Sequence, residues 1–432
     1  MSSTLFLAFF LVLLLLYVIG LPVGYALGMT VIFVMLAPIG PDGNFAALAQ
    51  RAYSGMDEWV LLAVPFFIFA GRLMNESGIT EDLFDFATEL VGTMQGGLAQ
   101  VNVIVSVIFS GMSGSAVADA AGLGVIEYEA MTSYGFDGRD AVGVTGASAV
   151  IGPIIPPSIP IVIYAVLVQE SIGALFIAGL VPGLLMAAAL MVTIAWLARR
   201  HDWPQGDPID VRRLIRSLLR TIPGLMTPII IVGGIIFGIF TATEAAIVAS
   251  IWAILVGTFY YRGLGLAAYA RVCRDTIEDT ASIIIILGFA NLYAFWLTLS
   301  GIPNILGTWI LGLSDSVVIT LLILTLMLLF LGTFMETMAI LLVITPVLVP
   351  LFPVLGIDPY HFGILMIVTL MYGLITPPFG IILFVLERVT DVELIDVMKA
   401  MLPYYVPLGL VLLAVVLFPE LSLYLPRTMG LL

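Results

Sequence analysis

The chain has 432 residues, of which 61% are hydrophobic and 10% are charged. Ordinary soluble domains carry roughly a quarter charged residues, so this composition excludes a water-soluble fold and predicts a polytopic membrane protein. A net charge of −14 excludes a nucleic-acid-binding face, and one cysteine with two histidines excludes an intramolecular disulfide and a Cys/His zinc site.

Apolar stretches long enough to span a bilayer follow one another through most of the chain. A spanning helix needs about 20 mostly apolar residues. The N-terminal stretch lacks a basic region and a small-residue cleavage motif, so we expect a retained crossing rather than a signal peptide. The sequence predicts crossings at residues 4–20, 21–38, 60–76, 137–168, 174–198, 223–240, 244–261, 281–300, 361–387 and 402–419.

Two further apolar stretches, 97–132 and 317–354, are each interrupted in the middle. The first carries the small-residue tip SGMSGS at 110–115, and the second carries GTFMET at 332–337. Irregular backbone is tolerated at membrane depth only where protein or a wet cavity surrounds it. We therefore expect two re-entrant hairpins here rather than two simple crossings.

The chain also repeats itself at a fixed offset. Gly111 and Gly332 at the tips are 221 positions apart, and so are Gly152 and Gly373, which open the segments GPIIPP and GLITPP. An offset shared by several landmarks predicts two copies of one module. The predicted division is a first repeat at 1–198 (hairpin about 97–132, broken helix 137–168), a basic linker at 199–222, and a second repeat at 223–432 (hairpin about 317–354, broken helix 361–387).

Basic residues orient this repeat in the membrane, because arginine and lysine mark the cytoplasmic side. The linker 199–222 carries six arginines, and counting crossings outward from it places thirteen of the fifteen basic residues inside. Arg72 and Arg139 are interpreted as interface anchors. Five crossings per module turn the second copy upside down, so the two tips would meet near the midplane and both termini would be periplasmic. That is the inverted-repeat arrangement of secondary transporters.

The two tips offer oxygen atoms for a small hard cation. The first provides the hydroxyls of Ser113 and Ser115, and the second provides Thr333, Glu336 and Thr337, with Glu336 equivalent to Ser115. Freed carbonyls and hydroxyls suit sodium, and exposed amides at a helix start suit a carboxylate. The alternative is a close-packed face of small residues between helices.

Two proline pairs, Pro156-Pro157 and Pro377-Pro378, should each break a crossing, because proline removes a backbone donor. Carbonyls of Gly152 to Ile155 could complete a cation site with the first tip, and those near Thr376 could do so with the second. Ser158 could cap the restarted half-helix. A simple proline kink is the alternative.

Two acidic residues, Asp119 and Glu244, could have either a structural or a functional role. Asp119, one turn after Ser115, could orient a ligand or serve a structural hydrogen bond. Glu244, where two crossings meet, is interpreted as a helix cap, with a transport role as the alternative. The sequence has no Walker phosphate loop and no intramembrane histidine pair, so we expect neither ATP hydrolysis by that route nor an intramembrane enzyme.

Five segments carry a family resemblance. With them, nearly the whole chain resembles the large membrane subunit of TRAP transporters, the tripartite ATP-independent periplasmic transporters. The resemblance implies an all-α, elevator-type secondary transporter in which a domain with both hairpins and both broken helices slides against a scaffold. The segments are GMSGSAVADAAGLG (111–124), GPIIPPSIPIVIYA (152–165), FTATEAA (240–246), GTFMETMA (332–339) and GLITPPFG (373–380).

The resemblance also implies location, partners and ligands. The location would be the bacterial inner membrane. The partners would be a separate small four-helix membrane subunit, a periplasmic substrate-binding protein and membrane lipid. The cargo would be a small organic anion, a carboxylate or sugar acid, with sodium as the coupling ion and no cofactor. The runner-up is a stand-alone sodium- or proton-coupled anion carrier of related architecture that needs no binding protein.

Carried over by position, the resemblance implies two sodium sites and one substrate site. Substrate would lie between the tips and the starts of the second half-helices. The implied sodium ligands are Ser113, Ser115 and the backbone near Gly152 in one site, and Gly332, Thr333 and the backbone near Thr376 in the other. The implied substrate contacts are Ser115, Asp119, Pro157, Ser158, Glu336, Pro378 and Phe379.

Overall fold

The structure is a computed structural model of the chain that describes residues 3–36, 45–91, 94–205, 210–301, 308, 312 and 316–432. Within these ranges the regular backbone is helical, apart from one isolated bridge between Gln95 and Gln205. Eight helical segments of this part are long and apolar enough to cross a membrane. The prediction of an all-α, polytopic membrane protein is confirmed. The eight segments are 59–76, 172–201, 211–236, 242–260, 266–299, 317–334, 337–355 and 394–417.

The first half of the chain contains the first predicted hairpin and the first predicted broken helix. The hairpin stretch is α6, α7 and α8, and the broken crossing is α9 and α10. The elements are α1 (Ser3–Val18), α2 (Val23–Leu36), α3 (Phe45–Met56), a 3-10 turn (Trp59–Leu62), α4 (Ala63–Glu76), α5 (Ile79–Val91), α6 (Gly97–Ser113), α7 (Ala116–Ala121), α8 (Leu123–Ser133), α9 (Gly138–Ala149), α10 (Ile159–Val168) and α11 (Ile172–His201).

The second half repeats this pattern. Its hairpin stretch begins with α16 and α17, and its broken crossing is α19 and α20. The elements are α12 (Val211–Ile236), α13 (Ala242–Leu255), a π turn (Val256–Tyr260), α14 (Leu266–Leu299), α16 (Val317–Phe334), α17 (Thr337–Leu348), a 3-10 turn (Val349–Leu351), α18 (Phe352–Leu355), α19 (Pro359–Leu374), α20 (Ile381–Val389), α21 (Leu394–Leu417) and α22 (Glu420–Thr428).

Helix caps recur at the same offset of 221 as the sequence landmarks. Asp137 and Asp358 each accept a hydrogen bond from the backbone N–H two residues later, at 2.8 and 2.9 Å. Gly135 and Gly356 precede these caps with positive φ of 96° and 64°, a conformation that glycine adopts without steric cost. The two halves therefore end and restart corresponding helices by the same local devices.

Three helices begin earlier than the hydropathy pattern predicts. α12, α14 and α21 start at residues 211, 266 and 394, whereas the predicted crossings start at 223, 281 and 402. Their N-terminal parts carry charges that lower the average hydropathy, yet side-chain interactions support the helix there. Asp210 caps α12, and Arg274 and Glu278 form an i,i+4 ion pair of 2.8 Å in α14. The second half of the linker 199–222 is thus part of α12.

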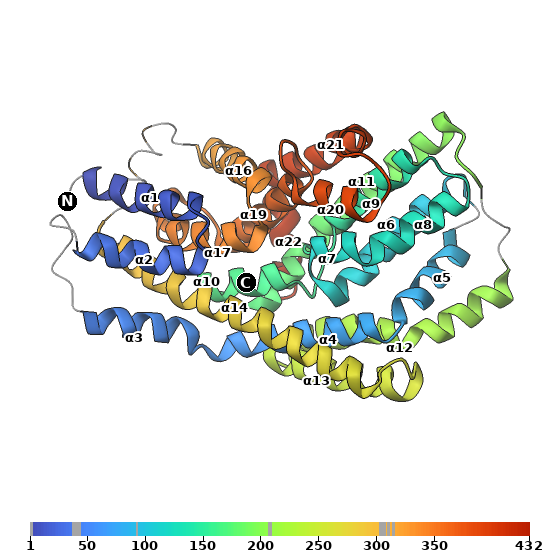
Figure 1. Cartoon of the computed structure of the whole chain (residues 1–432), viewed down its shortest axis with the longest axis horizontal. Coiled ribbons are helices and arrows are strands. Elements are labelled where there is room, and N and C mark those ends of the chain that lie inside the picture. The colour runs from blue at the N-terminus through green and yellow to red at the C-terminus, as the bar shows by residue number, and fades with distance from the viewer. Residues whose placement is uncertain are drawn as a thin grey trace.

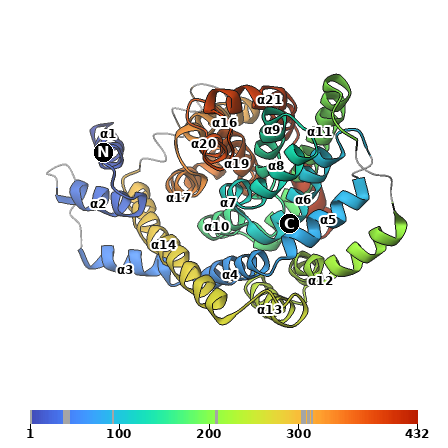
Figure 2. The same cartoon turned by 45° about the vertical axis from the view of Figure 1, so that its right-hand side comes forward.

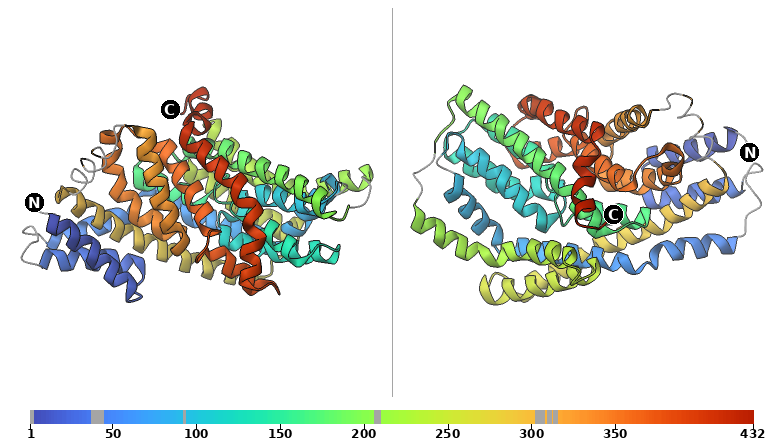
Figure 3. Two further views of the ribbon diagram at one scale, coloured as in Figure 1. Left: turned by 90° about the horizontal axis from the view of Figure 1, so that it is seen from above. Right: turned by 180° about the vertical axis from the view of Figure 1, so that it is seen from behind.

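The buried apolar side chains form two separate hydrophobic cores, one large and one small. Figure 1 shows α3, α4, α12, α13 and α14 along one edge, with the hairpin and broken-helix elements gathered beside them, and Figure 2 shows the same arrangement after a turn. α2, α3 and the second half of α14 share a small separate core that includes Leu27, Val31, Leu48, Tyr293 and Trp296. Figure 3 shows α1, α2 and α3 at one end of the molecule. The large core joins the hairpins and broken helices with α4, α11, α12, α13, α21 and residues of α14 such as Val272.

Candidate functional site

A cavity of about 540 Å³ lies where the two tips meet. Ser115 lines it from the first tip and Glu336 from the second, and Pro153 lines it from the break before α10. Arg72 of α4 and Asp279 of α14 line it as well. Cavities of about 300–1,000 Å³ are typical of sites for small organic molecules. Both tips therefore line one cavity whose volume is in the range typical of a small-molecule site.

The first tip is a glycine turn followed by a serine cap. Gly114 has a positive φ of 57°, and Ser115 Oγ accepts a hydrogen bond of 3.4 Å from Ala118 N, which starts α7. A Cβ at Gly114 would lie 3.2 Å from Ile159 N and 3.6 Å from Pro157 O. The first tip thus packs directly on the break between α9 and α10. The side chain of Ser113, which ends α6, lies outside the described residues.

The second tip is capped by a carboxylate. Glu336 Oε2 accepts hydrogen bonds from Met338 N at 2.8 Å and Ala339 N at 3.2 Å, which starts α17. Thr333 is buried, and its backbone carbonyl accepts a hydrogen bond of 3.1 Å from Gly380 N. Since Gly380 directly precedes α20, the second tip packs on the break between α19 and α20.

Ser158 closes the first break. Its hydroxyl donates to the carbonyl of Pro153 on one side of the break and accepts a hydrogen bond of 3.3 Å from Ile161 N on the other. The predicted cap of the restarted half-helix is confirmed. Ser158 is 1% exposed, and it lies behind the neighbouring Ile159 and Pro160, which line the cavity.

The second break is held by a tyrosine that sequence reasoning missed. Tyr405 Oη of α21 donates a hydrogen bond of 2.6 Å to the carbonyl of Ile375. Thr376 Oγ1 donates to Tyr372 O at 2.7 Å, which closes the end of α19 on itself. Phe379 is exposed and packs against Phe334 at 5.2 Å between ring centroids. No local pattern marks Tyr405, because its partner lies 30 residues away on another helix.

The predicted substrate contacts divide into three groups. Ser115 and Glu336 line the cavity. Asp119 is 2% exposed and is not part of the described cavity lining, whereas Ala118 and Ala121 of the same helix are. Pro157, Ser158, Pro378 and Phe379 stand at the breaks, outside the described lining of the cavity.

Apart from Ser115, which lines the cavity, and Ser113, whose side chain lies outside the described residues, the predicted sodium ligands belong to the tips and breaks and are not part of the described cavity lining. Gly152 belongs to the buried first break and directly precedes Pro153, which lines the cavity. Gly332 touches Gly373 backbone to backbone, and Thr333 and Thr376 flank that contact. Backbone carbonyls and hydroxyls are the ligands available there, which is the oxygen chemistry that a hard cation prefers.

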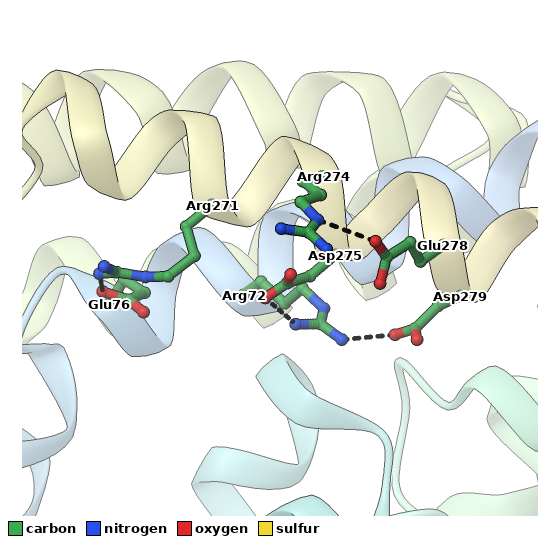
Figure 4. Close-up of polar contacts among 7 residues, drawn as sticks. All are labelled: Arg72, Glu76, Arg271, Arg274, Asp275, Glu278 and Asp279. Carbon is green, nitrogen blue, oxygen red and sulfur yellow. Dashed lines mark hydrogen bonds and ion pairs between the residues drawn. The ribbon is translucent and has the colours of Figure 1, made fainter.

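The cavity wall opposite the tips carries an ion-pair cluster, which also was not anticipated. Arg72 Nη1 donates to Asp275 Oδ2 at 3.2 Å, and Nη2 donates to Asp279 Oδ2 at 2.5 Å (Figure 4). Arg271 pairs with Glu76 at 3.0 Å in the same cluster. The structure thus places Arg72 in the site rather than at an anchor. The signal available was an arginine inside a crossing, together with aspartates at i,i+4 on another helix.

Glu244 has the structural role predicted for it. Its Oε2 accepts a hydrogen bond of 2.8 Å from Thr241 N, while Thr241 Oγ1 accepts one of 3.3 Å from Glu244 N. This reciprocal capping box starts α13. The interpretation as a cap is confirmed.

Comparisons with known proteins agree with this architecture. Residues 10–421 match the family described as "Tripartite ATP-independent periplasmic transporter, DctM component". The chain is 42% identical over 408 residues to the sialic acid TRAP transporter large permease protein SiaM of Vibrio cholerae, covering 94% of this chain and 95% of that protein. It is 38% identical over 390 residues to the C4-dicarboxylate TRAP transporter large permease protein DctM of Pseudomonas aeruginosa, covering 90% and 91%.

The fold also resembles a solved structure. The crystal structure of the Alcanivorax borkumensis YdaH transporter aligns with a TM-score of 0.62 over 91% of this chain and 90% of that one. The two sequences share 15% identity, so this likeness concerns the fold alone.

Proposed function

The chain belongs to the DctM-component family of tripartite ATP-independent periplasmic (TRAP) transporters, and on that premise we propose that it imports a small organic anion by coupling to sodium. Large permeases of this family work with a small membrane subunit and a periplasmic binding protein. We propose that both partners are separate polypeptides here, and that the complex lies in a bacterial inner membrane with both termini of this chain in the periplasm.

One observation carries the proposal: a single chamber of about 540 Å³ is bounded by both tips. Ser115 and Glu336 occupy equivalent positions of the repeat and face that chamber together. A substrate held between them would contact both halves of the protein at once. This is the geometry that alternating access requires of a site between repeats.

Sodium would bind beside the chamber, at the two contacts between tip and break. The first site would use Ser113, Ser115 and the backbone at Gly152, and the second would use Gly332, Thr333 and the backbone at Thr376. Each net positive charge that moves inward contributes about 2.3 kcal/mol at 100 mV. Two sodium ions with a monoanion therefore leave one net charge to drive import.

We propose that each of the two predicted repeats, 1–198 and 223–432, contributes one hairpin and one broken helix to the part of the protein that moves. Both hairpins and both broken helices share the large core, whereas α2 and α3 share a small core with the second half of α14. We propose that the hairpins and broken helices slide as a unit along the wall made by α4 and α14. The arginine-rich segment 199–220 supports a cytoplasmic position for the centre of the chain.

The cargo class follows from the relatives and from the chemistry of the site. The two relatives described above are named for sialic acid and for C4-dicarboxylates, and both are carboxylates. The hydroxyl of Ser115 and the guanidinium of Arg72 line the cavity and can donate hydrogen bonds to such an anion. We propose a carboxylate or sugar acid as the cargo.

The test is uptake by proteoliposomes that contain this chain with its small subunit. Radiolabelled N-acetylneuraminate and succinate are supplied with and without the binding protein, under an inward sodium gradient or in sodium-free buffer. We expect uptake of one of these acids only when both the binding protein and sodium are present. Uptake without the binding protein would establish the stand-alone carrier instead, and undiminished uptake in sodium-free buffer would refute sodium coupling.

A further inference from the structure

An organic anion in the cavity needs a positively charged or N–H-donating partner. Among the described residues that line the cavity, Arg72 is the only basic one, while Asp279 and Glu336 are acidic. An anion that enters this chamber without a partner would meet net negative charge. The partner must therefore be Arg72, a bound cation or a set of backbone amides.

The protein itself already engages some of the amides at the helix starts. Ser115 accepts from Ala118 N at the start of α7, and Glu336 accepts from Met338 N and Ala339 N at the start of α17. Ser158 does the same for α10. These caps satisfy donors that a carboxylate would otherwise use. They leave Arg72 as the side chain best suited to bind the substrate's charge.

The cluster holds the Arg72 guanidinium in place without exhausting its donors. A guanidinium has five N–H groups in a rigid plane, and the ion pairs with Asp275 and Asp279 engage one on Nη1 and one on Nη2. Asp275 and Asp279 lie one turn apart on α14 and grip the group from the same helix (Figure 4). The side chain of Arg72 keeps 36% of its surface exposed, which leaves room for a further oxygen ligand.

Only one of the two aspartates shares the cavity with Arg72. Asp279 is part of the lining, and Asp275 is outside its described members. A carboxylate that approaches from the chamber would therefore meet the Arg72–Asp279 pair first. It would compete for Nη2, while Asp275 continues to orient the guanidinium through Nη1.

We propose that Arg72 is a carboxylate subsite for the transported anion and that Asp279 is a built-in competitor for it. This inference rests on the proposed function, because it assumes that the cavity receives an organic acid. Because Asp279 competes for the guanidinium, the affinity of the acid for Arg72 stays low. The acid can therefore dissociate from Arg72 when the tips release it. The pair would thus favour passage over tight binding.

The alternative is that the cluster has a purely structural role and that its ion pairs only hold α4 against α14. Arg271 and Glu76 provide a matched control. They join the same two helices in the same cluster at 3.0 Å, and they lie outside the described lining of the cavity.

The experiment measures the binding of N-acetylneuraminate and succinate to the purified complex of this chain with its small subunit. The readout is the acid concentration that gives half of the maximal thermal stabilisation, compared with the methyl ester of each acid. We expect Arg72→Gln to raise this concentration at least 10-fold and Arg72→Lys to raise it less. Asp279→Asn should lower it several-fold, and Arg271→Gln should leave it unchanged.

A substrate subsite predicts that Arg72→Gln raises the half-saturating acid concentration and that Asp279→Asn lowers it. A purely structural ion pair between α4 and α14 does not predict these opposite effects. A half-saturating concentration that stays constant in both variants, or that rises equally in both, would overturn the inference. If Arg72→Gln does not fold, the sign of the Asp279→Asn effect still decides. Failure of the unsubstituted complex to bind either acid would count against the proposed function and the inference alike, whereas binding unaffected by these substitutions overturns the inference alone.

Discussion

Gly332 of α16 and Gly373 of α19 touch backbone to backbone: a Cβ at Gly373 would lie only 2.8 Å from Gly332 Cα. A contact this close requires the absence of side chains on both helices, which is how small residues allow helices to approach inside membranes. It places the second tip against the second break, where the proposed second sodium site lies.

Replacing Gly373 with alanine should force α16 and α19 apart. Overpacking of this kind costs about 1–3 kcal/mol, and the displaced carbonyls should also weaken the stabilisation by sodium. Thermal unfolding of the purified protein at increasing NaCl concentration measures both effects. Gly233→Ala in α12 is the control, because a Cβ there would meet no atom within 4 Å. An unchanged melting temperature and salt response in Gly373→Ala would contradict the close contact.

Ser158→Ala should destabilise the first break. The serine hydroxyl caps α10 and bridges to Pro153 O, and loss of a serine cap costs about 0.5–2 kcal/mol. We expect a lower melting temperature, largely restored in Ser158→Thr because threonine is also a good cap. If Ser158 instead contacts substrate directly, Ser158→Ala would weaken acid binding without any change in the stability of the acid-free protein.

Bulky substitutions at the proposed sodium ligands should abolish coupling. Thr333 is 5% exposed, so Thr333→Phe cannot be accommodated without moving the second tip, and Ser113→Phe should act likewise at the first. We expect sodium-dependent uptake to fall more than 10-fold in each variant, while each variant is still recovered from the membrane fraction and elutes as a single peak in gel filtration. Thr298→Phe is the control, since Thr298 is exposed and makes the same kind of hydrogen bond to its own helix. Undiminished sodium dependence in both tip variants would rule out the site assignment.

Asn102→Ala should remove a buried polar link between α6 and α9. Asn102 Nδ2 donates to Thr145 Oγ1 at 3.0 Å, and its Oδ1 accepts from the Ser148 hydroxyl. All three side chains are buried, and unsatisfied buried polar groups cost about 1–3 kcal/mol. Chemical denaturation in detergent should show that loss. The exposed pair Gln95–Asp202 offers the comparison: Gln95→Ala should change stability little, and an equally small effect of Asn102→Ala would mean that the link is dispensable.

Much of the helix order was predictable from the sequence because the signals are local. The tip at Gly114–Ser115, the cap at Ser158 and the capping box at Thr241–Glu244 each depend on residues within a few positions of one another. Hydropathy placed the crossings but not the charged N-terminal parts of α12 and α14. A window average cannot see an ion pair or a cap that continues a helix.

The direction of a side chain around its helix was beyond the sequence. Asp119 and Ala118 are neighbours on α7, yet Ala118 lines the cavity and Asp119 is buried behind it. Which face of a helix meets a chamber depends on the helices packed against it. A residue four positions after a tip could point either way, and only the packing of α7 decided it.

The sequence by itself determined the class of this protein, the positions of its helix breaks and its family, because composition, proline, glycine and capping residues act over short distances. Only the tertiary structure brought Arg72 of α4 and Asp279 of α14, 207 positions apart, to the chamber between the tips. The physical reason is that the pairing of distant helices depends on how their whole surfaces fit together, which no single segment of the chain encodes.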